Sequence, residues 1–330
     1  MPNLPLSLAC WNYDRTRAIV DGRVRVDGID LTCLDLPVEE TFFRMLRHQE
    51  FDVAEMSLSS YVLSLAADDP PFIAIPVFPS RFFRHSCIYV HAGARIARPQ
   101  DLAGRLVGTP EYQMTAPVWI RGILADAYGV PVDSVTYATG GLEEPGRPEK
   151  LALDLPPRIQ VRRIGPTQTL SAMLASGEID ALYTARAPSS FRAGNGRVRR
   201  LFGDFVGVER EYFRQTRIFP IMHTIAIRRR VYERHRWIAQ SLFKAFELAK
   251  AIAYDDLEQT AALKVMLPWL PAHLEDARRE MGEDFWPYGL AANTGVLSTF
   301  LRYSHEQGLS PRRLAPDQLF ARETLESFKI

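Results

Sequence analysis

The stretch MLRHQEFDV at residues 45–53 recurs as MLASGEIDA at residues 173–181, with Met, Leu, Glu and Asp at the same spacing. Each copy is typical of a helix end, a tight turn and a buried strand. One interpretation is coincidence, since these signals are common in α/β proteins. The other is two similar lobes that each deliver the end of a strand to a shared cleft, because open α/β sheets bind ligands beyond the carboxyl ends of their strands.

Strand and helix signals alternate around both copies. Residues 4–10 and 106–108 are typical of strands, and Thr109 and Pro110 are typical of a helix cap and a first helical residue. That helix is expected to end near Gly129, and the chain from about Tyr232 onward has mainly helical patterns. We therefore predict an α/β fold of two lobes, with a mostly parallel sheet, a central ligand cleft and a helical C-terminal part.

Two β-rich segments, residues 78–91 and 218–228, are expected to cross between the lobes. On this basis lobe I comprises residues 1–84 plus 224–330, and lobe II comprises residues 85–223. A chain of 330 residues, 47% of them hydrophobic, is long enough for two cores.

Composition excludes several classes of partner. The 40 Lys and Arg nearly balance the 39 Asp and Glu, so neither nucleic acid nor an anionic membrane is expected. No apolar run approaches the ~20 residues that span a bilayer. The N-terminus lacks the basic and apolar regions of a signal peptide, which predicts a cytoplasmic protein. The scattered cysteines Cys10, Cys33 and Cys87 are expected to be small buried side chains.

The densest group of chemically active residues is SRFFRHS at residues 80–86. Arginine suits bidentate carboxylate binding, and histidine suits proton transfer near neutral pH. On a regular strand Arg81 and His85 share one face and Arg84 lies on the other. The alternative is a solvated edge strand with its charges pointing outward.

A second group is GTPEYQMT at residues 108–115, where a helix start after a strand favours anions. Glu111 either compensates the helix dipole, or acts as a catalytic acid or binds a hydroxyl group. Tyr112 and Thr115 are candidates to hydrogen-bond a ring hydroxyl.

Other candidates come from the two-lobe arrangement. Glu55, Ser57 and Arg186 follow the repeated strands, and Asp14 follows the first strand. His223, in the second crossing, is either a core histidine or a proton donor. Neither His-x-x-x-His nor Cys-x-x-Cys occurs, so no dedicated metal site is expected.

Six segments, in order along nearly the whole chain, are FDVAEMSLSSY, PVFPSRFFRHSCIYV, GTPEYQMTAPVWIRGIL, GGLEEPGR, FPIMHTIAIRR and WPYGLAANTGVLSTFLRYSHEQGL. Together they resemble the 4,5-dihydroxyphthalate decarboxylase family. The resemblance implies the type II periplasmic-binding-protein fold. It also implies a carboxy-lyase that converts 4,5-dihydroxyphthalate to protocatechuate and CO₂ without a cofactor.

The site residues are taken from the two-lobe arrangement. The expected catalytic residues are His85, His223 and Glu111. The residues expected to bind a small aromatic carboxylate are Asp14, Glu55, Ser57, Arg81, Arg84, Tyr112, Thr115 and Arg186.

Two alternatives and one open question remain. A solute-binding protein for an aromatic carboxylate has the same fold without catalysis, but the lack of a signal peptide argues against it. A thiamine-pyrimidine synthase is a second enzyme class with this fold. This chain has no evident counterpart of the histidines and cysteines that bind iron in that enzyme. Whether the chain forms a homo-oligomer stays open.

Overall fold

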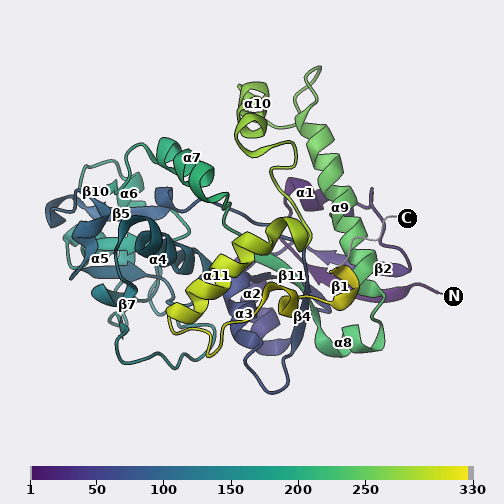
Figure 1. Cartoon of the computed structure of the whole chain (residues 1–330), viewed down its shortest axis with the longest axis horizontal. Helices are drawn as coiled ribbons and strands as arrows, with labels where there is room; N and C mark the ends of the chain where they lie inside the picture. The colour runs from purple at the N-terminus through teal and green to yellow at the C-terminus, as the bar shows by residue number, and fades with distance from the viewer. Residues whose placement is uncertain (1, 326–330) are drawn as a thin grey trace. The chain divides into compact units, whose positions relative to one another are not determined.

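The computed structural model describes residues 2–325, which divide into two compact units (Figure 1). Unit 1 comprises residues 2–81, 221–297 and 314–325, and unit 2 comprises residues 82–220 and 298–313. The predicted lobe I included all of residues 224–330, whereas residues 298–313 belong to unit 2. The reason is packing, because Gln307 accepts a hydrogen bond of 2.7 Å from the buried Arg121 of unit 2.

Unit 1 contains a five-stranded sheet in the order β2-β1-β3-β11-β4. Strand β1 is parallel to β2 and β3, and β11 is antiparallel to β3 and β4. The strand bounds are β1 Leu4–Ala9, β2 Ile29–Leu34, β3 Val53–Ser57, β4 Phe72–Ile75 and β11 His223–Arg228.

Unit 2 contains a six-stranded sheet in the order β10-β5-β9-β6-β7-β8. Its bounds are β5 Ile88–His91, β6 Leu106–Thr109, β7 Thr136–Thr139, β8 Gln160–Arg163, β9 Ala181–Tyr183 and β10 Val198–Arg200. Strand β6 is parallel to β7 and β9, and β5 is antiparallel to β9 and β10. From β7 to β10 the strand order is β7-β6-β9-β5-β10, and its strand directions match those of β2-β1-β3-β11-β4 in unit 1. Strand β8 is an additional strand at the β7 edge. The sheets are therefore mixed, each with a parallel part and an antiparallel part.

The repeated sequence occupies equivalent elements in the two units, as predicted. Helix α2 (Val38–His48) and helix α5 (Leu170–Ser176) both end in a left-handed residue, Gln49 with φ 49° and Gly177 with φ 82°. The repeated aspartates then bind the neighbouring parallel strand. Asp52 Oδ2 accepts from the backbone N–H of Ser7 at 2.9 Å, and Asp180 Oδ2 accepts from that of Leu106 at 3.0 Å.

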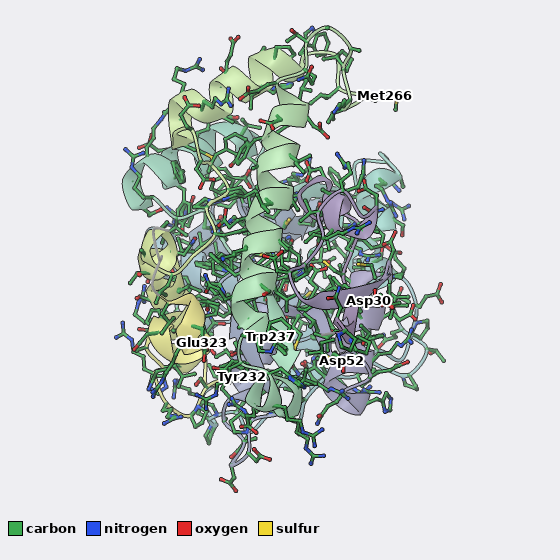
Figure 2. All side chains as sticks on the ribbon, turned by 90° about the vertical axis from the view of Figure 1, so that its right-hand side faces the viewer. Asp30, Asp52, Tyr232, Trp237, Met266 and Glu323 are labelled. Atoms are coloured by element: carbon green, nitrogen blue, oxygen red, sulfur yellow. The ribbon has the colours of Figure 1, made fainter. Side chains whose placement is uncertain are left out.

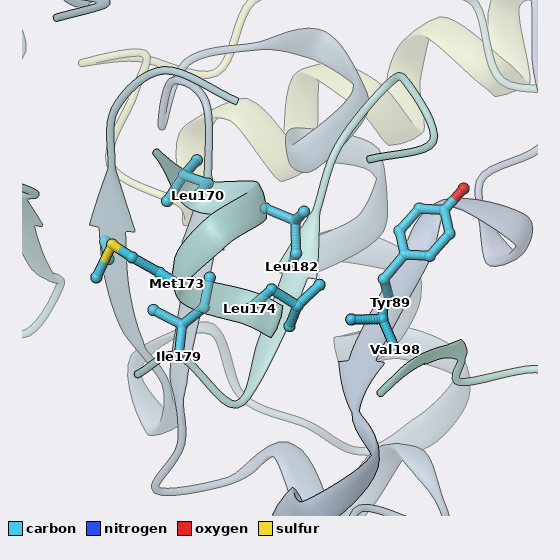
Figure 3. Close-up of a cluster of buried hydrophobic side chains, with 8 residues drawn as sticks. Tyr89, Leu170, Met173, Leu174, Ile179, Leu182 and Val198 are labelled. Atoms are coloured by element: carbon cyan, nitrogen blue, oxygen red, sulfur yellow. The ribbon is translucent and has the colours of Figure 1, made fainter. Parts of the chain in front are cut away.

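The second copy also supplies the core of unit 2 (Figure 3). Met173, Leu174 and Ile179 are buried there against Leu182 and Val198. Each such side chain stabilises the fold by about 1.5–3 kcal/mol when it leaves water. The repeat is thus explained by packing and by strand attachment.

The remaining helices complete the two units. Their bounds are α1 Asp14–Val20, α3 Leu58–Ser64, α4 Thr115–Tyr128, α6 Ser189–Arg192, α7 Phe205–Thr216, α8 Arg229–Arg234, α9 Ile238–Leu257, α10 Leu270–Met281 and α11 Thr294–Glu306. The C-terminal third is helical, as predicted, since α8 to α11 follow β11.

The two expected crossings are less regular than predicted. In the first crossing, only β5 is a strand, and Pro79 of that crossing lacks the N–H that a paired strand requires. Arg81 forms an isolated bridge with Ile221, and residues His85–Cys87 form a 3₁₀ turn. Arg81 and His85 therefore do not share the face of one strand, and they belong to different units.

Candidate active site

A polar cluster in unit 1 lies at the carboxyl edge of its sheet. Strand β1 ends at Ala9, β3 ends at Ser57, and the antiparallel β11 begins at His223, opposite Ser57. Residues after β1, at the end of β3 and at the start of β11 therefore meet at one edge. This is the edge at which open α/β sheets bind ligands.

The centre of the cluster is a carboxylate–imidazole pair. His223 Nδ1 lies 2.6 Å from Oε1 of Glu55. The Glu55 side chain is fully buried, whereas that of His223 is 16% exposed. Phe42 packs edge-on against the imidazole at 4.8 Å between ring centroids. Within residues 2–325, Nε2 of His223 has no hydrogen-bond partner, so this nitrogen is available to a ligand.

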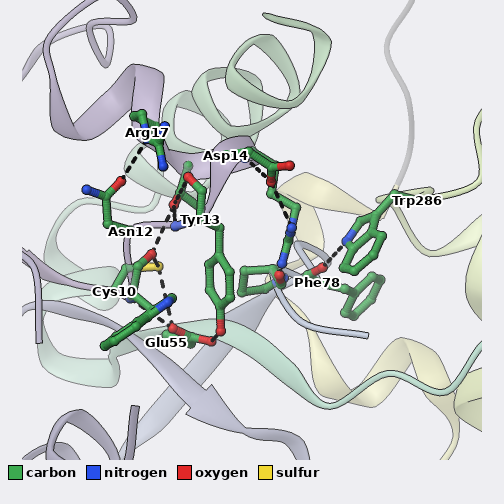
Figure 4. Close-up of polar contacts among 12 residues, drawn as sticks. Cys10, Asn12, Tyr13, Asp14, Arg17, Glu55, Phe78 and Trp286 are labelled. Atoms are coloured by element: carbon green, nitrogen blue, oxygen red, sulfur yellow. Dashed lines mark hydrogen bonds and ion pairs between the residues drawn. The ribbon is translucent and has the colours of Figure 1, made fainter. Parts of the chain in front are cut away.

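Glu55 accepts further hydrogen bonds (Figure 4). The Tyr13 hydroxyl donates to Oε1 at 2.7 Å, and the backbone N–H of Trp11 donates to Oε2 at 3.0 Å. Burial by itself raises the pKa of Glu55, but the charge of His223 and these hydrogen bonds outweigh it and lower that pKa. Glu55 is therefore a carboxylate at neutral pH.

Two neighbouring acids are kept neutral by burial and by the charge of the same carboxylate. Burial and the charge of Glu55 raise the pKa of the Cys10 thiol and of the Tyr13 hydroxyl well above their usual values. Cys10 Sγ lies 3.7 Å from Glu55 Oε2. Because a thiol needs a depressed pKa to act as a nucleophile, Cys10 is suited to packing and hydrogen bonding.

A positioned guanidinium completes the cluster. Arg15 Cζ lies 4.3 Å from the Tyr13 ring centroid and 4.1 Å from that of Trp286. Its Nε donates to the carbonyl of Pro79 at 2.6 Å, and its Nη1 pairs with Asp14 at 2.8 Å. The Arg15 side chain is 16% exposed, so it is fixed in place yet reachable.

Ser57 and Arg81, two other predicted site residues of unit 1, have buried side chains. Ser57 is buried in the β3–β11 ladder beside the pair. Arg81 is buried and donates to the carbonyl of Pro287 at 2.7 Å and to the side chain of Asn293. Burial lowers the pKa of Arg81 to about 9, which leaves the guanidinium charged at neutral pH.

In unit 2, Glu111 is buried and neutralised by two cations. Its carboxylate lies 2.5 Å from Lys150 Nζ and 2.7 Å from Arg147 Nη2. The predicted helix start at residues 109–111 is wrong, because α4 begins at Thr115. The Thr109 hydroxyl instead donates to the carbonyl of Glu111 at 3.1 Å and closes a turn before the helix.

Tyr112 and Thr115 follow Glu111 and are also buried. The Tyr112 hydroxyl donates to the carbonyl of Gln307 at 3.1 Å, and Arg121 stacks on its ring at 3.9 Å from the centroid. Burial raises the pKa of Tyr112. A nearby pocket of about 410 Å³ is lined by Arg147 and Arg163 among mainly apolar side chains.

His85 lies in an aromatic enclosure formed by Tyr128, Phe202 and Tyr212, with ring centroids 5.2–5.9 Å away. Neither ring nitrogen has a hydrogen-bond partner within the described part of the chain. Burial lowers the pKa of His85 to about 4, so the ring is neutral at neutral pH. Arg84 is buried nearby with Nη1 3.5 Å from Cys87 Sγ, and Arg186 is exposed after β9.

The structure thus gathers Asp14, Glu55, Ser57 and His223 at one edge of the unit 1 sheet. Glu111, Tyr112 and Thr115 are close in sequence in unit 2. Sequence reasoning missed Cys10, Tyr13, Arg15 and Trp286. The first three follow β1 directly, which is the position that singled out Asp14, whereas no local pattern marks Trp286.

Two features are absent from residues 2–325. No group of three or more His, Cys, Asp or Glu side chains there is arranged to hold a metal ion. No helix in the same range is long and apolar enough to cross a membrane.

Comparison with known proteins identifies the family. The chain is 46% identical over 330 residues, the full length of both proteins, to a curated protein of Comamonas testosteroni named 4,5-dihydroxyphthalate decarboxylase. The chain belongs to the 4,5-dihydroxyphthalate decarboxylase family. No family model matches it. The identity covers every element that carries the cluster described above.

Solved structures place this decarboxylase family member in the fold of solute-binding proteins. The aliphatic sulphonate binding protein SsuA of Escherichia coli covers 98% of the chain, and the chain covers 99% of SsuA, with a TM-score of 0.56 and 16% identity. The desulfurization enzyme DSZB matches 98% of each chain with a TM-score of 0.52 and 15% identity. At such identities the likeness shows the fold alone, and it confirms the predicted type II periplasmic-binding-protein-like class.

Proposed function

We propose that this protein decarboxylates 4,5-dihydroxyphthalate to protocatechuate and CO₂, with His223 as the proton donor. The observation that carries the proposal is the His223–Glu55 pair, in a chain whose full-length relative is named for this reaction. The pair combines a buried carboxylate, a 2.6 Å contact and a ring nitrogen open to a ligand.

Decarboxylation requires that a proton be added to the ring carbon that bears the departing carboxylate. Each carboxylate of the substrate is para to a hydroxyl, whose lone pair feeds electron density to the carbon that bears the carboxylate. Imidazolium Nε2–H of His223 donates its proton to that carbon. The carbon–carboxylate bond then breaks, its electron pair returns to the ring, and CO₂ leaves. Water reprotonates His223, so one proton is consumed for each CO₂ released.

Glu55 supports this step without touching the substrate. Its carboxylate fixes the orientation of the imidazole through Nδ1 and stabilises the positive charge of the donor. Tyr13 and the backbone N–H of Trp11 hold the carboxylate in turn. Glu55 is therefore a positioning residue, although the sequence analysis assigned it to substrate binding.

Arg15 is the proposed anchor for the carboxylate that remains on the ring. Its guanidinium is held flat between Tyr13 and Trp286, which suits bidentate binding of a carboxylate. Asp14 orients this guanidinium. The predicted roles of Glu111, Tyr112, Thr115, Arg84, His85 and Arg186 stay predictions.

The proposal includes catalysis without a cofactor, since the ring itself accepts the electron pair. Turnover is expected to survive exhaustive chelation. Loss of turnover on chelation and its recovery with zinc, iron or manganese would contradict this part. A cytoplasmic location and a homo-oligomeric state stay expectations.

The competing function is binding of an aromatic carboxylate without catalysis, as the fold of SsuA allows. The fold also occurs in a desulfurization enzyme, so it does not by itself favour either function. A binding protein would take up 4,5-dihydroxyphthalate and return it unchanged.

The deciding experiment is incubation with 4,5-dihydroxyphthalate in D₂O, with CO₂ and the ring product measured. We expect stoichiometric CO₂ and one deuterium at the carbon that lost its carboxylate. Phthalate, which lacks the hydroxyls, should bind without losing CO₂. His223→Asn should abolish most of the turnover, and His48→Asn, an exposed control on α2, should not. Binding of 4,5-dihydroxyphthalate without CO₂ would support the competing function instead.

A further inference from the structure

A pocket of about 320 Å³ lies in unit 1, at the sheet edge opposite to the His223–Glu55 pair. Leu4, in its wall, is the first residue of β1, and Arg228 is the last residue of β11, which begins at His223. At about 3.4 Å per residue, β11 separates Arg228 from His223 by roughly 17 Å. The lining residues are Leu4, Leu6, Gln49, Arg228, Arg230, Val231, Arg234 and His235.

The lining is basic and contains no carboxylate. Arg230 and Arg234 are exposed four residues apart on α8, where like charges repel. Neither has an ion-pair partner within residues 2–325. An anion in the pocket would relieve this repulsion.

Arg228 adds a partly satisfied guanidinium. Its Nη2 binds Asp52 at 2.5 Å and its Nη1 donates to the carbonyl of Gln49 at 3.3 Å. Its Nε is buried and has no hydrogen-bond partner in the described chain. Asp52, the acid that pairs with Arg228, is also bound to Ser7. Asp52 and Tyr232 of α8 are labelled on this face of unit 1 in Figure 2.

The rest of the wall is apolar. Leu6 is buried, and Leu4 and Val231 are half-buried. A ligand that satisfies both parts needs an anionic group for the arginines and a small apolar body for the leucines and valine.

We propose that this pocket is a second ligand site, separate from the His223–Glu55 pair, for a small organic anion with an aromatic or short aliphatic body. The site lies on the strands that carry the pair. Arg228 ends the strand that begins with His223, and its partner Asp52 directly precedes the strand that carries Glu55. The two strands that carry the pair therefore also reach this pocket.

The test uses phenyl phosphate as probe, with inorganic phosphate supplying charge alone and phenol supplying the ring alone. Calorimetric titration of the full chain should show saturable binding of phenyl phosphate, about 10-fold tighter than that of either fragment. The double variant Arg230→Glu/Arg234→Glu should weaken this binding by at least about 10-fold. The double variant Arg230→Lys/Arg234→Lys should retain part of it.

The matched control is Arg192→Glu/Arg197→Glu, which changes the net charge equally through exposed residues of unit 2. It should leave the affinity unchanged. Three outcomes would overturn the site: no saturable binding of phenyl phosphate at millimolar concentration, unchanged affinity and stoichiometry in the Arg230/Arg234 charge reversal, or an equal loss in the control. Since none of these readouts depends on turnover, they are independent of the proposed decarboxylation.

Discussion

His223 and Glu55 are 168 residues apart in sequence, and their side chains meet at 2.6 Å. The contact depends on the antiparallel register of β3 and β11, which places His223 opposite Ser57 and Ile225 opposite Glu55. A slip of one residue would turn these side chains to opposite faces of the sheet. Strand pairing therefore fixes the geometry on which the proposed proton transfer depends.

Glu55→Gln should reduce turnover by about 10²–10⁴ while substrate affinity changes little. The amide keeps the shape of the side chain but removes the charge that stabilises protonated His223. Steady-state kinetics and a separate binding measurement distinguish the two effects. Tyr13→Phe, which removes one donor to the same carboxylate, should cost only about 1 kcal/mol of transition-state stabilisation. Normal turnover in Glu55→Gln would contradict the positioning role.

Arg15→Ala should weaken substrate binding by about 2–5 kcal/mol, because a desolvated carboxylate loses its hydrogen-bonded cation. Arg15→Lys should recover only part of the affinity, since an ammonium group does not reproduce the planar fork. Binding of 4,5-dihydroxyphthalate to variants that also carry His223→Asn measures affinity without turnover. Arg17→Ala is the control, because Arg17 is exposed two residues further along the same helix and its side chain makes only a long contact with Asn12. Equal effects of the Arg15 and Arg17 substitutions would argue against an anchor.

His85 should make the protein less stable in mild acid. Its pKa falls from 6.5 in the unfolded chain to about 4 in the folded one because of burial. Between pH 6.5 and pH 4, His85 is protonated in the unfolded chain but not in the folded one. The free energy of unfolding therefore decreases as the pH drops toward 4. The total loss is about 3 kcal/mol.

The variant His85→Leu should remove this dependence without loss of stability at pH 7, since neither ring nitrogen has a partner in residues 2–325. Denaturant unfolding at pH 7 and pH 4.5 measures both quantities. His48→Leu, at an exposed histidine, should leave the pH dependence intact. Turnover is the second readout, because the sequence analysis named His85 as catalytic. A large loss of turnover in His85→Leu with unchanged stability would favour that role over His223.

Asp52→Asn and Asp180→Asn should each lower the free energy of unfolding by about 1–3 kcal/mol. Each aspartate accepts a backbone hydrogen bond from the neighbouring parallel strand and pairs with an arginine, Arg228 or Arg105. Denaturant unfolding measures the loss. Asp317→Asn, at a residue with no such contact, is the control. A loss confined to one of the two aspartates would mean that the repeated residues do not have equivalent structural roles.

The repeat was the most informative part of the sequence. It predicted two similar α/β units because helix end, turn and strand are all local signals. Arg81 and His85 could not be placed in the same way, because the chain makes only an isolated bridge at Arg81 and turns at His85–Cys87, so no strand joins the two residues. Arg147 and Lys150, which bind Glu111, lie 36 and 39 residues further along the chain. They belong to an irregular segment without the hydrophobic periodicity that predicts a helix or a strand. Tyr13 and Arg15 were missed although they adjoin Asp14, because their importance comes from contacts with Glu55 and Trp286 made only in the folded chain.

The division of the C-terminal region between the two units bears on biosynthesis. Residues 298–313 complete unit 2, and the segment that follows belongs to unit 1. Nascent domains usually fold in order from the N-terminus as they emerge from the ribosome. Here neither unit is whole until residue 313 has emerged. A chain that stops before residue 298 therefore lacks a segment of each unit.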